Sequence, residues 1–206
     1  MKRLSTTLAI LLVAAFAASP MLVQAQMGAP KEKSEVAKLI EAAMASNIRS
    51  ADERARDAKE RKPVETLEFF GLQPNMTVVE LMPSGGWYTK ILAPVLAEKG
   101  KLIVAVGGAR LAPKLLEWKL DKVEAQDGKF EFRPSGQYGV GEIDAMESPI
   151  TGADMVLTFR NMHNFTPAAR AKINATVFGM LKPGGIFGVV DHTRRHMEPG
   201  AVEHWR

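Results

Sequence analysis

The stretch Val78-Val79-Glu80-Leu81-Met82-Pro83-Ser84-Gly85-Gly86-Trp87-Tyr88 decides the fold of this chain. It begins as an apolar strand, passes through a turn that contains two glycines, and ends at the start of a helix. In doubly wound α/β proteins this junction lies beside a nucleotide-like ligand, because glycines admit the ligand to the backbone and the helix N-terminus offers free N–H groups. A tight strand-to-helix turn without any ligand gives the same pattern, so the rest of the chain must distinguish the two interpretations.

Strand-like and helix-like segments alternate from residue 77 to residue 190. We expect strands at residues 77–81, 102–106, 129–132, 154–159 and 186–190. The helices between them are expected at residues 88–98, 111–125 and 166–181, and residues 134–152 are expected to form a long loop. Because parallel strands need crossover helices, this order predicts an α/β fold with a doubly wound, mostly parallel Rossmann-like sheet and helices on both faces.

The region before the sheet is predicted to be helical. Ser50 and the acidic residues after it indicate a new helix N-terminus, and Pro63 suits the first turn of another helix. We therefore divide the chain into a helical segment at residues 26–62 and an α/β domain at residues 63–206. The basic helix after Ser50 is either a solvated surface or a cover for a ligand pocket, in which case Arg54 or Asp57 folds over the ligand.

The first 25 residues are typical of a secretory signal peptide. Lys2 and Arg3 precede the apolar run Leu8–Ala18, and Val23-Gln24-Ala25 has the small-x-small pattern of a cleavage site. We expect cleavage after Ala25 and a periplasmic or secreted protein. The apolar run is short for a bilayer span, so no permanent membrane anchor is expected.

Composition narrows the class of protein further. A chain of 206 residues that is 46% hydrophobic suffices for a single domain with a real core. The absence of cysteine excludes thiol chemistry and cysteine-bound metals. Loss of Lys2 and Arg3 with the signal peptide lowers the formal charge from +4 to +2, which gives no argument for a nucleic-acid partner.

The order of these segments resembles the class I S-adenosylmethionine-dependent methyltransferases. The likeness rests on Val78–Gly86 at the family's Gly-rich motif, on Ala153–Leu157 at its fourth strand, and on the turn Leu181–Phe187. A closer likeness is to exported bacterial methyltransferase-like proteins. It is based on the segments Lys62–Leu72, Gly86–Thr89, Thr158–Asn164 and Val189–His192. Together the resemblance covers roughly residues 48–200.

The resemblance implies S-adenosylmethionine as cofactor and a set of residues that bind it. These are Glu80, Pro83, Ser84, Gly85, Gly86, Trp87 and Asn161. The candidate catalytic residues follow the ends of the fourth and fifth strands, and they are Asn161, His163, Asp191 and His192. Carboxyl ends of parallel strands meet at one edge of the sheet, where ligands bind. Imidazole takes up a proton near neutral pH, so His163 is the candidate general base, and Asp191 is a candidate either to orient a histidine or to hold substrate.

Three features depart from the family pattern. Met82 and Ser84 occupy places that the family usually fills with glycine. Gly107 stands at the end of the second strand, where the family usually has an acid that binds the ribose hydroxyls. The chain stops at Arg206, so the last two strands of the family's sheet are expected to be missing.

These observations leave three hypotheses for function. The first is an exported S-adenosylmethionine-dependent methyltransferase that acts on a small molecule or an envelope component. The second is a ligand-binding or sensor protein that keeps the fold without catalysis. The third is a metal-assisted hydrolase that uses His163, His192 and His196, although no three ligands are fixed by the sequence and no metal site is predicted.

Overall fold

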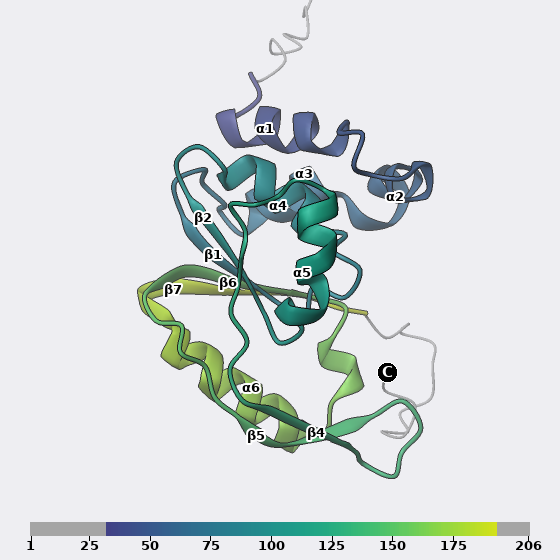
Figure 1. Cartoon of the computed structure of the whole chain (residues 1–206), viewed down its shortest axis with the longest axis vertical. Coiled ribbons are helices and arrows are strands. Elements are labelled where there is room, and N and C mark those ends of the chain that lie inside the picture. The colour runs from purple at the N-terminus through teal and green to yellow at the C-terminus, as the bar shows by residue number, and fades with distance from the viewer. Residues whose placement is uncertain (1–31, 193–206) are drawn as a thin grey trace, which may run out of the picture. The chain divides into compact units, whose positions relative to one another are not determined.

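A five-stranded parallel sheet forms the centre of the computed structural model, which describes residues 32–192 (Figure 1). The spatial order of its strands is β3-β2-β1-β6-β7, and every neighbouring pair is parallel. The strands are β1 (Thr77–Leu81), β2 (Lys101–Ala105), β3 (Glu124–Ala125), β6 (Ala153–Phe159) and β7 (Leu181–Val190). The predicted parallel α/β sheet is therefore confirmed. The predicted signal peptide and His196 lie outside the described residues.

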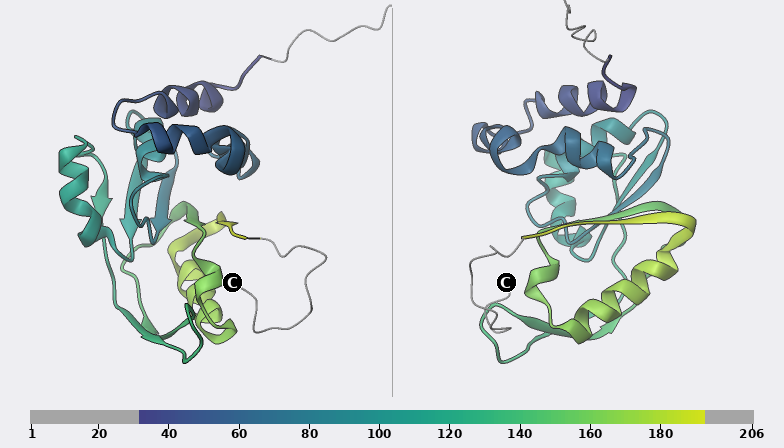
Figure 2. Two further views of the ribbon diagram at one scale, coloured as in Figure 1. Left: turned by 90° about the vertical axis from the view of Figure 1, so that its right-hand side faces the viewer. Right: turned by 180° about the vertical axis from the view of Figure 1, so that it is seen from behind.

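Helices cover both faces of the sheet (Figures 1 and 2). Successive strand residues point to opposite faces, so Val78 and Leu157 join one core cluster while Val79 and Val156 join the other. The first cluster packs under α1 (Glu35–Met44), α3 (Pro63–Phe69) and α4 (Thr89–Leu96), with α5 (Gly108–Glu117) beside it on the same face. The second cluster packs under α6 (Pro167–Met180).

The N-terminal helices share the core of the sheet. In α1, whose N-cap is Ser34, Val36 and Ile40 are buried in the same cluster as α4. The predicted helix start at Ser50 is confirmed, because its hydroxyl and the Glu53 carboxylate form a reciprocal capping box at the start of α2 (Ala51–Arg56). A π-helical turn, η1 (Asp57–Arg61), then leads into α3, which begins at Pro63 as predicted.

The third strand of the sheet differs from the prediction. Residues 129–132 were expected to fill that place, but β3 is Glu124–Ala125, inside the segment expected to be helical. Helix α5 ends at Glu117, and Lys119 takes the left-handed backbone conformation that stops a helix (φ 57°). No glycine marks this stop in the sequence, so the prediction extended the helix too far.

The predicted long loop at residues 134–152 contains a strand instead. Here β5 (Gly141–Met146) pairs antiparallel with β4 (Phe130–Pro134) in a separate hairpin that lies against α6. Lys172 and Thr176 of α6 hold the hairpin by donating hydrogen bonds to backbone carbonyls of β5. The strand is short and only two of its six residues are buried, which gave it little apolar signal.

No helix within residues 32–192 combines the length and apolar character needed to span a bilayer.

Candidate functional site

The central strands end at a crevice. The neighbours of β1 are β2 on one side and β6 on the other, so the strand order reverses there, and open α/β sheets bind ligands at such points. The residues directly after these strands, Met82, Val106 and Arg160, all have left-handed backbones with φ between 53° and 61°. Such conformations cost on the order of 1–3 kcal/mol each and cluster at functional sites. The backbone is thus strained where the sheet opens to a ligand.

The first wall of the crevice is the turn between β1 and α4. Gly85 faces open space, since a methyl group placed on it would meet no protein atom within 4 Å. Gly86 instead packs against Trp118, whose ring a Cβ would approach to 2.7 Å. Glu80, Pro83, Ser84, Gly85 and Trp87 therefore line the hollow above this turn, as the sequence suggested, whereas Gly86 does not. We call this space of about 320 Å³ the central hollow.

Glu80 lies at the floor of the central hollow. Its side chain is buried, and the Thr89 hydroxyl donates a hydrogen bond to it at 2.6 Å. Burial raises the pKa of the Glu80 carboxyl to about 8, although the hydrogen bond from Thr89 opposes this. Glu80 is therefore mostly protonated at neutral pH, and a cationic ligand group in the hollow would favour its ionised form.

The second wall carries the histidines. His163 lies in the short 3-10 turn η2 (Met162–Asn164) after β6, and Asp191 follows β7. The His163 Nδ1 atom is 2.6 Å from Asp191 Oδ1, and the His163 backbone N–H donates to Asp191 Oδ2 at 2.9 Å. Because a carboxylate accepts, the proton lies on Nδ1 and leaves the Nε2 lone pair for a proton from another group. The structure thus brings together His163 and Asp191, two of the candidate residues that follow strand ends.

Asn161 joins the two walls. Its side-chain nitrogen donates to the Met82 carbonyl at 3.2 Å and to the Thr158 hydroxyl at 2.9 Å. Its two N–H donors are therefore used in holding the ends of β1 and β6 together. Asn161 lines the central hollow, and its amide oxygen is the atom left for a ligand.

A second space, the lateral hollow of about 450 Å³, adjoins the first and shares Met82, Ser84 and Asn161 with it. Gly107 lies on its wall, and a methyl group there would also meet open space. An acid from elsewhere in the chain, Asp127, lies beside Gly107 on the same wall. Its carboxylate accepts hydrogen bonds of 2.9–3.0 Å from the N–H groups of Gly107, Gly108 and Ala109.

Electrostatics keep Asp127 ionised. Burial by itself would raise the pKa of its carboxyl, but the backbone donors at the start of α5 hold the pKa below the usual value. Asp127 follows β3, which the sequence placed elsewhere, so the role of this residue was not predictable from its position. The lateral hollow therefore combines an acidic rim with a glycine that admits a ligand.

Two arginines were also missed. Arg61, at the end of η1, and Arg160, after β6, both line the central hollow. Arg54 and Asp57, the candidates for the alternative in which this helix covers a ligand pocket, do not line the central hollow. Asp57 accepts two hydrogen bonds of 2.8 Å from Arg49 in the core, and Arg54 donates to the Arg49 carbonyl. The π-helical turn that turns Arg61 toward the crevice has no sequence signature, which explains the omission.

Among the described residues, one group of side chains could hold a metal ion, and it includes both histidines. Ligand atoms of His163, Asp191 and His192 lie within 4.8 Å of one another. Arg160 Nε donates to His192 Nε2 at 3.1 Å, however, so a guanidinium cation occupies the flank of this cluster. A positive charge at that distance opposes binding of a metal cation. The third histidine proposed for a metal, His196, lies outside residues 32–192.

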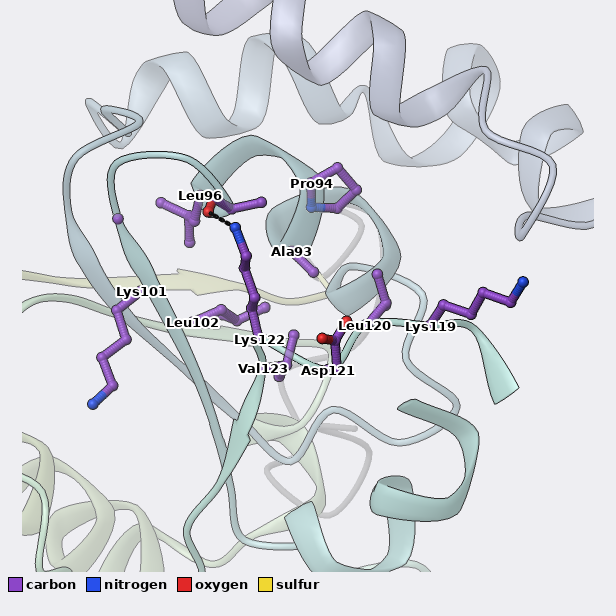
Figure 3. Close-up of a pocket in the computed structure, with 12 residues that line it drawn as sticks. Ala93, Pro94, Leu96, Lys101, Leu102, Lys119, Leu120, Asp121, Lys122 and Val123 are labelled. Carbon is purple, nitrogen blue, oxygen red and sulfur yellow. Dashed lines mark hydrogen bonds between the residues drawn. The ribbon is translucent and has the colours of Figure 1, made fainter. Parts of the chain in front are cut away.

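A different cavity lies at the other end of the sheet (Figure 3). It measures about 250 Å³ and lies between the last turn of α4, the start of β2 and the segment before β3. Ala93, Leu96, Leu102, Leu120 and Val123 supply apolar walls, and Lys122 Nζ donates across it to the Ala97 carbonyl at 3.0 Å. We call it the basal cavity. It contains no histidine, in contrast to the crevice, and its polar lining consists of Lys101, Lys119, Asp121 and Lys122.

Comparisons with known proteins agree with the fold. No family model matches the chain. It is similar to an uncharacterised methyltransferase of Synechocystis sp., with 28% identity over 125 residues. That match covers 61% of this chain and 51% of the other protein, so the chain spans about half the length of this curated relative. It is also similar to the crystal structure of an S-adenosylmethionine-dependent methyltransferase from Aquifex aeolicus.

The structural match has a TM-score of 0.51 and 19% sequence identity, and it covers 74% of this chain and 79% of the other. The chain therefore has the fold of that methyltransferase.

Proposed function

We propose that this protein is an S-adenosylmethionine-dependent methyltransferase that acts on a protic acceptor, such as a hydroxyl group. The observation that supports this most is the pair formed by His163 and Asp191. It faces the glycine turn of β1 across one crevice, in a fold shared with a methyltransferase. The curated relative, itself described as a methyltransferase, supports the same reaction class.

The crevice has the room and the chemistry that the cofactor requires. The central and lateral hollows measure about 320 and 450 Å³, within the range of about 300–1,000 Å³ typical of ligand pockets. Gly85 and Gly107 open onto them without obstruction. We assign Glu80, Ser84, Gly85 and Asn161 to the methionine and ribose side of the cofactor. The Glu80 carboxyl would ionise beside a cationic group.

Catalysis in this proposal needs few side chains. The bound cofactor supplies a methyl group that its sulfonium already activates, so the protein mainly aligns donor and acceptor. Asp191 holds the His163 ring through Nδ1. The Nε2 atom of His163 then accepts the proton that the acceptor hydroxyl loses. Asn161 fixes the separation of the two walls by bonding Met82 and Thr158.

Isothermal titration of the protein with S-adenosylmethionine and S-adenosylhomocysteine tests the proposal. We expect micromolar binding that Gly85→Val abolishes, because the new side chain enters space that the protein leaves open. Gly179→Ala is the matched control, since Gly179 of α6 also has nothing within 4 Å but lies away from the crevice. Absence of binding at millimolar ligand by folded protein would refute the proposed function.

We further propose that the protein is exported and that its acceptor is a small molecule or an envelope component. The pattern of residues 1–25 and the likeness to exported methyltransferase-like proteins support export. N-terminal sequencing of the protein from periplasmic and cytoplasmic fractions tests this. We expect a mature chain that begins at Gln26, and a chain retained in the cytoplasm with residues 1–25 intact would contradict it.

A further inference from the structure

Two arginines line a part of the crevice that the proposed reaction does not use. Arg61 and Arg160 line a space of about 310 Å³, which we call the arginine hollow, together with Tyr88 and His192. The same four residues also line the central hollow, so the two spaces are neighbours. The arginine hollow thus lies beside the proposed base, His163, which belongs to the central hollow.

Neither guanidinium has an acidic partner among residues 32–192. The ion pairs of this part of the chain do not include Arg61 or Arg160. Two acids line the hollow. Asp191 binds His163, and Glu60 pairs with Arg56 at 4.0 Å on the surface and acts on Arg61 as a nearby charge that raises its pKa, without forming an ion pair with it. In addition, the buried Nε atom of Arg61 has no hydrogen-bond partner. Unsatisfied buried donors of a cation are costly, and a ligand acceptor would relieve that cost.

The two like charges are held close by the surrounding structure. Burial lowers the pKa of Arg61, and repulsion from Arg160 lowers it further. The guanidinium of Arg61 lies 5.1 Å from the centre of the Trp87 ring, and its backbone carbonyl accepts hydrogen bonds from Thr66 and Tyr88. The Nε atom of Arg160 donates to His192 Nε2 at 3.1 Å. Both cations are therefore positioned before any ligand arrives.

We propose that Arg61 and Arg160 bind an anionic group, a carboxylate or a phosphate, of the methyl acceptor. Guanidinium groups match these oxyanions with paired, charge-assisted hydrogen bonds. The identification of the ligand as the methyl acceptor rests on the proposed methyltransferase function. Binding of an anion by the two arginines does not require that S-adenosylmethionine binds. The acceptor then carries its anionic group in the arginine hollow and its hydroxyl beside His163.

Two stacked aromatic rings form part of the wall of the same crevice. Tyr88 and Phe159 stack with ring centres 3.5 Å apart and an angle of 10° between their planes, and both line the central hollow. A metal cation fits the same place poorly, because the two guanidiniums repel it.

The test uses isothermal titration of the full chain, without donor, with 4-hydroxybenzoate, with the uncharged 4-hydroxybenzamide and with inorganic phosphate. We expect millimolar or tighter binding of the two anions and about tenfold weaker binding of the amide. Arg61→Gln and Arg160→Gln should each weaken 4-hydroxybenzoate about tenfold and leave the amide unchanged. The lysine variants should retain part of the affinity, because they keep the charge.

Arg56→Gln is the matched control, because Arg56 lies one helical turn from Arg61 but pairs with Glu60 and does not line the hollow. It should bind both anions as the parent does. If one glutamine variant does not fold, the other still decides the matter. Failure of the parent chain to bind either anion, or equal binding by all variants, would overturn the inference.

A donor titration on the same samples separates the two proposals. Anion binding without binding of S-adenosylmethionine would leave the arginine site standing and defeat only the methyltransferase function. Donor binding without anion binding would defeat only the arginine site.

Discussion

The two ends of the parallel sheet are built differently. At the carboxyl ends, the residues after β1, β2 and β6 are strained, Glu80 is buried without a cationic partner among the described residues, and a histidine is bound to an aspartate. At the amino ends, the side chains tie the fold together. The Asp154 carboxylate accepts the Thr77 N–H at 2.7 Å and pairs with Lys182, and the basal cavity has apolar walls (Figure 3).

This contrast separates the end of the sheet that carries backbone strain from the end that stabilises the fold. Strained backbones and incompletely paired polar groups persist only where the surrounding fold enforces them. The amino-end contacts help to provide that enforcement, since they fix β1 against β6 and close the sheet under α4. We therefore expect changes at the carboxyl end to alter ligand chemistry, and changes at the amino end to alter stability alone.

Asp191→Asn should have the largest effect. The amide cannot hold His163 with Nδ1 protonated as a carboxylate does, so kcat with the best acceptor from a panel of hydroxybenzoates should fall about 100-fold or more. The affinity for S-adenosylmethionine should not change. Asp154→Asn is the control, because it alters a carboxylate at the opposite end of the sheet and should keep kcat. Full turnover by the Asp191 variant would contradict the expectation that catalysis depends on the carboxyl end of the sheet.

Leu102→Ala tests the amino end. Leu102 is buried and lines the basal cavity, so truncation enlarges an existing hollow. We expect the free energy of unfolding in urea to fall by about 3 kcal/mol, with donor affinity unchanged. Leu116→Ala, at a side chain that is 75% exposed, should change stability by less than about 0.5 kcal/mol. A large loss of donor affinity in Leu102→Ala would show that the ends are coupled.

Glu80→Gln addresses the pH dependence of the carboxyl end. The pKa of Glu80 is about 8 in the folded protein and 4.5 without the effects of folding, so the folded state holds this proton more tightly. Ionisation therefore destabilises the fold as pH rises from about 4.5 to about 8. Relative to the glutamine variant, the parent should lose at most about 1.4 kcal/mol of stability per pH unit in this window.

Glu80→Gln should also change how the affinity for ligand depends on pH. If a cationic ligand group stabilises ionised Glu80, the parent's affinity for S-adenosylmethionine should rise between pH 6 and pH 8, and that of the glutamine variant should stay level. Urea unfolding and titration calorimetry at several pH values measure both effects. Identical pH profiles for the two proteins would exclude Glu80 as the titrating group.

Ser84→Gly should give the smallest effect on stability, and this substitution should stabilise the protein. Ser84 has a φ of 52°, which glycine adopts without steric cost. Relief of that strain stabilises the folded protein, whereas glycine also makes the unfolded chain more flexible and so favours unfolding. The net gain in the free energy of unfolding should be about 0.5–1 kcal/mol. Ser84→Ala keeps the strained backbone and should bring no gain. Thermal unfolding compares the three proteins, and a destabilised glycine variant would mean that the serine side chain matters more than its backbone.

Much of this contrast could be anticipated from individual residues. The apolar runs of β1, β2 and β6 predicted buried parallel strands, and the position of Asn161, His163, Asp191 and His192 after strand ends predicted that they would share one edge. Asp154 was read as part of a family motif without a role. The structure places it at the amino end, where it binds the start of β1.

The remaining features depend on contacts between distant segments. Arg61 reaches the crevice through a π-helical turn, and Asp127 reaches Gly107 only because the chain turns after an unmarked helix end. Hairpin β4–β5 replaces a predicted sheet strand and a predicted loop, because it packs on α6 rather than on the edge of the sheet.

The sequence by itself determined the central strands β1, β2 and β6, the helices beside them, their apolar faces and the edge of the sheet at which the polar residues gather, because periodicity and local turn chemistry are properties of neighbouring residues. The tertiary structure alone decided which atoms meet there. It paired His163 with Asp191, set Arg61 beside Arg160, and turned Gly85 to the hollow and Gly86 to Trp118. Such choices follow from packing between segments far apart in the chain, which no local pattern encodes.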